Sequence, residues 1–182
     1  LEELKRMAAE FVDQGGDAIF GNFVQQMLDA KDKGAFNQVS YDPSTGNYNQ
    51  GIKLTNGSQV TTQDGDIDLD GTGGGGALYG TGVVLYSGSS IAAGGTGNVT
   101  IDGAGGSGTS NTDGAATNSG SSIAAQTGNI EITGTAGGTG STNRGVNIAG
   151  TTLTTTGGNI LLEGTGSGTG SSNTGVFTAT AT

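Results

Sequence analysis

The sequence predicts a mainly β protein, a parallel β-helix with coils of about 31 residues, preceded by an α-helical hairpin. Three observations support this fold. Glycine contributes 39 of the 182 residues, whereas 31% are hydrophobic and 5% aromatic, so the core must be built from thin repeated layers. Short apolar blocks recur along most of the chain at a nearly constant interval. The first segment, Leu1 to Gly34, differs from the rest and holds four of the six basic residues.

The first region, residues 1–38, is expected to form the hairpin. Apolar residues recur every three or four positions from Leu1 to Val12 and again from Ile19 to Leu28, which is the period of one helix face. Gly15-Gly16 is a helix stop signal, and Asp17 is suited to cap the second helix. Because the hairpin is too small for a core of its own, we expect it to be a cap or an assembly element.

The second region, residues 39–182, is expected to be the β-helix. One block combines a glycine, an Asn or Asp and an alternation of apolar and polar residues, which is strand periodicity. Its copies are spaced by 32, 31 and 30 residues: Gly65–Gly71, Gly97–Gly103, Gly128–Gly134 and Gly158–Gly164. We expect Ile67, Val99, Ile130 and Ile160 to stack inward, and Asp66, Asn98, Asn129 and Asn159 to form a polar ladder at a corner.

Two further ladders keep the same period. One comprises Val60, Ser90-Ile91, Ser122-Ile123 and Thr152-Leu153; the other comprises Ile52–Leu54, Val83–Leu85, Ala115–Thr117, Val146–Ile148 and Val176–Thr178. Three short strands per coil favour a β-helix, because a propeller blade needs four strands in about 40 to 50 residues. The polar segments between coils, such as Gly103–Asp113, are expected to be surface bulges or a loosely ordered fourth side.

The repeat stops soon after Val176 opens a new coil. We therefore expect the β-helix to be incomplete at its C-terminus and to be completed by further repeats or by other copies of the chain, stacked head-to-tail.

Composition excludes several kinds of chemistry. The chain has no His, Cys or Trp, so it has no Ser-His-Asp or Cys-His nucleophile, no Cys/His zinc site and no disulfide. The net charge of −10 argues against a nucleic-acid partner. No apolar run approaches the roughly 20 residues of a transmembrane helix. We expect no catalytic residues, no cofactor and no enzymatic activity.

The acidic residues of the repeat are the candidate site residues. Stacked coils would place them in two outer columns, one with Asp68 and Glu131 and one with Asp70, Asp102 and Glu163. The simplest interpretation is a solvated acidic face that keeps the solenoid soluble. Carboxylates can also bind Ca²⁺, and paired carboxylates can cleave glycosidic bonds, so these alternatives stay open.

The repeated pattern GNIxIxGTGGxGTxxNxGVxI resembles the β-strand repeats of very large bacterial surface proteins and of filamentous-haemagglutinin-like adhesins, over about Val39 to Thr178. This resemblance implies an extracellular structural or adhesive protein at the cell surface, or a filament subunit, with glycans or cell-surface components as partners. The alternatives are a segment of a phage or virion spike or tail fibre, and a β-helix that binds or cleaves polysaccharide through the acidic columns.

Overall fold

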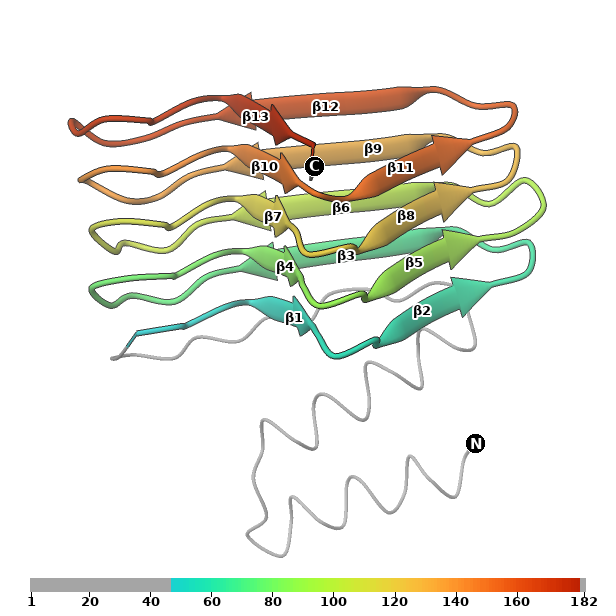
Figure 1. Cartoon of the computed structure of the whole chain (residues 1–182), viewed down its shortest axis with the longest axis horizontal. Coiled ribbons are helices and arrows are strands. Elements are labelled where there is room, and N and C mark those ends of the chain that lie inside the picture. The colour runs from blue at the N-terminus through green and yellow to red at the C-terminus, as the bar shows by residue number, and fades with distance from the viewer. Residues whose placement is uncertain (1–46, 181–182) are drawn as a thin grey trace, which may run out of the picture.

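The computed structural model describes residues 47–180, which form a β-solenoid of thirteen strands without a helix (Figure 1). The hairpin expected within residues 1–38 and the solenoid start expected near Val39 lie outside the described residues. The strands are β1 (Ile52–Leu54), β2 (Gln59–Thr62), β3 (Ile67–Thr72), β4 (Val83–Leu85), β5 (Ser90–Ala93), β6 (Val99–Ala104), β7 (Ala115–Thr117), β8 (Ser122–Ala125), β9 (Ile130–Thr135), β10 (Val146–Ala149), β11 (Thr152–Thr155), β12 (Ile160–Thr165) and β13 (Val176–Ala179).

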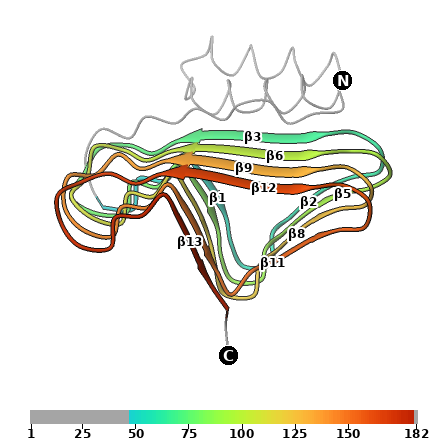
Figure 2. The ribbon, with the colours of Figure 1, turned by 90° about the horizontal axis from the view of Figure 1, so that it is seen from above.

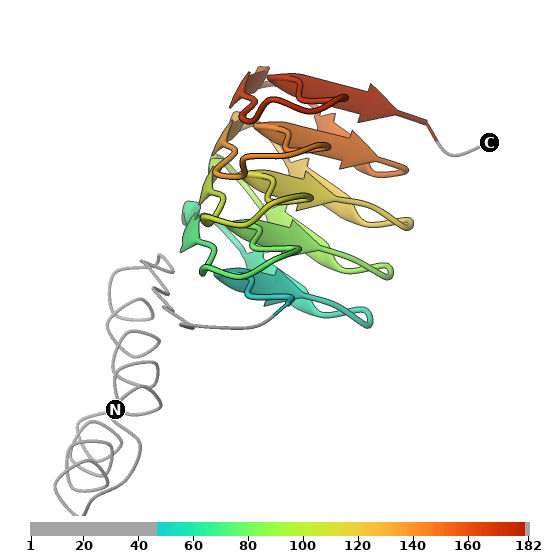
Figure 3. The same cartoon turned by 90° about the vertical axis from the view of Figure 1, so that its left-hand side faces the viewer.

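The strands form three parallel sheets, each taking one strand from every coil. Sheet A has the order β1-β4-β7-β10-β13, sheet B the order β11-β8-β5-β2, and sheet C the order β12-β9-β6-β3. Seen from above, the sheets enclose a triangle, and a fourth segment extends beyond it on one side (Figure 2). The side view shows the coils lying one above another (Figure 3). The predicted parallel β-helix with coils of about 31 residues is confirmed.

The core consists of the inward side chains of the three sheets, stacked in the predicted register. Ile67 pairs with Val99, Val99 with Ile130, and Ile130 with Ile160. The first three are at most 2% exposed. Ile160 is 42% exposed, because no described strand lies beyond β12. Each apolar column is therefore covered by the coils on either side of it, and little by the rest of its own coil.

The corner between sheets A and B accounts for part of the variation in the repeat length. In three coils it contains two consecutive residues with positive φ: Asn56-Gly57, Ser87-Gly88 and Ser119-Gly120. Glycine in the second position accepts this left-handed conformation without a steric penalty. The fourth coil turns with one residue fewer, using Gly150 at φ 61°, which shortens that coil without moving a strand out of register.

The predicted polar ladder at the next corner is also confirmed. The backbone N–H of Asn98 donates to Asp66 Oδ1 at 2.7 Å, that of Asn129 donates to Asn98 Oδ1 at 2.9 Å, and that of Asn159 donates to Asn129 Oδ1 at 2.8 Å. Each side chain thus satisfies a corner amide of the next coil, which the strand ladder does not reach.

Two columns of glycine meet where sheet C ends and sheet A begins, and we call this narrow part of the coil the neck. A Cβ atom on Gly134 would overlap the carbonyl oxygen of Gly145, and one on Gly103 would overlap that of Gly114. The same relation links Gly164 with Gly175 and Gly71 with Gly82. Because the two backbones are in contact, only glycine fits in both columns.

Beyond the neck, the segments between sheet C and sheet A form an ordered fourth side rather than loose bulges. Backbone hydrogen bonds join them from coil to coil, for example from Thr139 N–H to Gly108 O at 3.1 Å and from Thr169 N–H to Thr139 O at 3.0 Å. Each segment has a non-glycine residue with positive φ at the same place, Tyr48, Tyr79, Asn111, Thr142 and Ser172. The rings of Tyr48 and Tyr79 stack with centroids 4.6 Å apart.

The neck predicts that Gly134→Ala destabilises the protein by about 1–3 kcal/mol or more, because the new methyl group must push two backbones apart. Thermal or urea unfolding measures this effect. The matched control is Gly157→Ala, since a Cβ there would lie 3.4 Å from Thr127, an ordinary contact. Equal stability of the two variants would contradict the backbone contact at the neck.

Candidate functional site

The predicted acidic residues all lie on the outward face of sheet C. Register pairing gives one column of Asp68, Thr100, Glu131 and Leu161, and a second column of Asp70, Asp102, Thr133 and Glu163. Asp68, Asp102, Glu131 and Glu163 are exposed, and Asp70 is partly buried. The structure therefore brings the five residues to one face, in the two columns that the repeat predicts.

The carboxylates are spread along these columns instead of converging on one point. Asp70 and Asp102 are register partners, so their backbones lie one strand spacing apart, about 4.8 Å. Asp68 and Glu131 are separated by Thr100. Among residues 47–180, no group of three or more acidic side chains is arranged to hold a metal ion. Calcium binding and glycosidic cleavage by these residues stay predictions.

Like charges on this face act on Asp68. Burial raises the pKa of the Asp68 carboxyl above its usual value, and the neighbouring carboxylates Asp70, Asp102 and Asp66 raise it further. Asp102 has a compensating contact, since the Thr133 hydroxyl donates to its Oδ1 at 2.7 Å. The face is thus a solvated acidic surface with mutual repulsion between its members.

The fourth side holds a buried polar network that the sequence analysis did not identify. Asn143, which is fully buried, accepts from the Thr112 N–H at 3.1 Å and the Thr112 hydroxyl at 3.0 Å through its Oδ1. Its Nδ2 donates to Thr109 O at 3.0 Å. Its backbone N–H donates to Asn173 Oδ1 at 2.9 Å, which links it to the next coil. Asn143 thus takes the place of an apolar core residue on this side.

A second missed feature is the carboxylate of Asp113, which is 5% exposed. Its Oδ1 accepts from the backbone N–H of Arg144 at 2.8 Å, and its Oδ2 accepts from Asn147 Nδ2 at 2.8 Å. Burial raises the pKa of the Asp113 carboxyl, and the two hydrogen bonds and the charge of Arg144 oppose that rise. Asp113 also raises the pKa of Tyr86, although burial is the larger cause for that phenol.

One sequence signal pointed toward this region. An Asn lies two residues before the neck glycine in Asn49-Gln50-Gly51 and again in Asn143-Arg144-Gly145, but Gly80 and Thr112 occupy the corresponding places in other coils. The repeat alone therefore does not reveal that these side chains point into the fourth side.

No protein-family model, curated protein or solved structure matches this chain. Within the part of the chain that the structure describes, no helix is long and apolar enough to cross a membrane.

The two raised carboxyl pKa values predict that the protein gains stability in mild acid. The folded state holds a proton on Asp68 and Asp113 more tightly than the unfolded chain, in which the pKa is near 3.8. Stability therefore rises as pH falls from 7 through the folded-state values, and this gain is complete near the unfolded value. Melting temperatures measured between these limits test this, and a steady decrease on acidification would contradict it. The double variant Asp68→Asn/Asp113→Asn is expected to flatten the curve.

Two buried threonines give a matched pair of stability predictions. The Thr117 hydroxyl points into the core and has no hydrogen-bond partner, so Thr117→Val should stabilise the fold by about 1 kcal/mol. Thr112→Val removes the same hydroxyl from an equally buried residue, but leaves Asn143 short of a donor. It should destabilise the fold by about 1–3 kcal/mol. Denaturant midpoints measure both, and a stability loss in Thr117→Val would refute this assignment.

Proposed function

We propose that the protein is a non-enzymatic structural segment of an extracellular, surface-displayed protein or filament, which extends by adding coils along one axis. The resemblance of the repeat to bacterial surface adhesins supports this proposal, with glycans or other cell-surface components as partners. The observation that carries it is structural. Strands, corner amides and fourth side all form their hydrogen bonds with the neighbouring coils, so each added coil is stabilised by the previous one.

The last coil supports the same proposal. Within residues 47–180, β11, β12 and β13 each pair on one side only. Ile160, Leu161 and Val176 are 42%, 44% and 39% exposed on this coil. Such a surface matches a further coil in shape and hydrogen bonding, whether that coil comes from the same chain or from a second copy. Head-to-tail addition of copies produces an open-ended assembly.

The test uses the 182-residue chain. Sedimentation velocity over a concentration series, with electron microscopy of the same samples, should show elongated oligomers that grow along the solenoid axis. Ile160→Lys/Val176→Lys places two charges at the open edge and should shift association to at least about tenfold higher concentration, since each buried charge costs more than about 1.4 kcal/mol.

The matched control is Thr72→Lys/Thr135→Lys, which adds the same charge at exposed positions of β3 and β9 in other coils. It should associate like the unmodified chain. A chain that remains monomeric at high concentration, or an equal loss of association in both variants, would refute head-to-tail extension by these edges.

A further inference from the structure

Four side chains that depart from the repeat lie close together in three successive coils. Asp113 precedes β7, Arg144 and Asn147 belong to the β10 segment of the next coil, and Phe177 lies in β13 of the coil after that. Asp113 and Arg144 occupy equivalent positions, one residue before the neck glycines Gly114 and Gly145. Side chains from consecutive coils therefore lie within reach of one another.

Arg144 has an oppositely charged neighbour on one side, yet its guanidinium turns to the other side. Its Cζ lies 3.9 Å from the centroid of the Phe177 ring, which is a cation–π contact with the last described strand. The Asp113 carboxylate instead receives the backbone N–H of Arg144 and the Asn147 amide. The Arg144 Nε is buried and has no hydrogen-bond partner in this arrangement. The guanidinium thus contacts Phe177 without making every hydrogen bond that it could make.

We propose that Arg144 is a two-position latch for the coil that carries β13. With the guanidinium over Phe177, β13 is held on β10. When β13 separates from β10, the guanidinium turns toward the Asp113 carboxylate and forms an ion pair there. The ionised carboxylate therefore favours the open arrangement, and a neutral side chain at position 113 favours the docked one.

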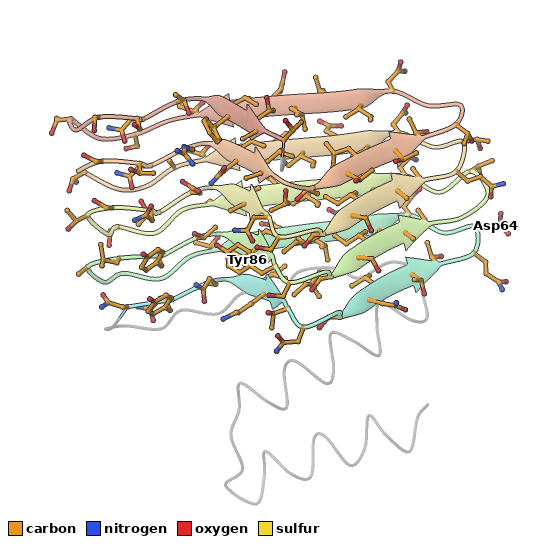
Figure 4. All side chains as sticks on the ribbon, in the orientation of Figure 1. Asp64 and Tyr86 are labelled. Atoms are coloured by element: carbon orange, nitrogen blue, oxygen red, sulfur yellow. The ribbon has the colours of Figure 1, made fainter. Side chains whose placement is uncertain are left out.

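The surroundings of Asp113 make it the group whose charge sets this balance. The charged or titratable groups around it are Arg144 from the β10 segment and Tyr86, which follows β4 (Figure 4). Arginine stays protonated at any relevant pH. The pKa of Tyr86 is raised from 10.0, so the phenol stays neutral. The pKa of Asp113 is raised by burial, which brings its change of charge to a higher pH than that of an exposed aspartate.

Amide hydrogen exchange of β13 in the full chain tests the latch, with protection factors compared after correction for intrinsic exchange. At pH 7, Asp113→Asn keeps the acceptor for the Arg144 N–H but removes the charge, and should raise protection in β13 about two- to fivefold. Phe177→Leu should lower it by a similar factor. Acidification should bring the unmodified chain to the level of Asp113→Asn, which should itself show little change.

The double variant separates the latch from a general effect of charge removal. In a Phe177→Leu background, Asp113→Asn should no longer change protection in β13, because its effect passes through the guanidinium–ring contact. Asp64→Asn removes the same charge from the exposed corner between β2 and β3 and should have no effect (Figure 4). Amides of β8 report global opening. Equal gains in β8 and β13, no gain in Asp113→Asn, or the same gain with and without Phe177 would each overturn the proposal.

Discussion

The contact between two glycine columns at the neck is the constraint on which the rest of the structure depends. Gly103 and Gly134 lie against Gly114 and Gly145 so closely that no side chain fits between the backbones. This contact closes the triangular core on one side and begins the polar fourth side on the other. It also holds the end of sheet C against the start of sheet A in every coil, which fixes where each strand begins. The high glycine content is therefore a requirement of the fold and not a sign of disorder.

Coil-to-coil hydrogen bonding then determines what the molecule can do. The Asn ladder and the fourth side satisfy their polar groups with the coils above and below, as the strands do. A stack of this kind can be lengthened without a new kind of interaction, which suits an extended structural element. Nearly identical coils, however, provide little that distinguishes one from another. Asp113, Arg144 and Phe177 break the repeat and supply contacts that are specific to particular coils.

The sequence predicted the parts of the fold in which one side chain has one role in every coil. The inward column of Ile67, Val99 and Ile130, the Asn ladder and both acidic columns follow directly from aligned repeats. The spacing of 32, 31 and 30 residues was not an obstacle, because corner turns absorb single residues. The fourth side could not be predicted in the same way. Its buried residues, such as Asn143, are polar, and their burial depends on partners like Thr112 that differ from coil to coil.

The central claim is that successive coils stack in parallel with the register set by the neck glycines. Because the chain has no cysteine, one engineered pair tests it directly. Thr100 and Glu131 are register partners on the outer face of β6 and β9, at a spacing of about 4.8 Å that a disulfide can bridge. Thr100→Cys/Glu131→Cys should therefore form an intramolecular disulfide under mild oxidation. Thr100→Cys/Ile132→Cys, shifted by one residue, places its thiols on opposite faces of the sheet and should remain reduced. Preferential cross-linking of the shifted pair would contradict the register and the fold built on it.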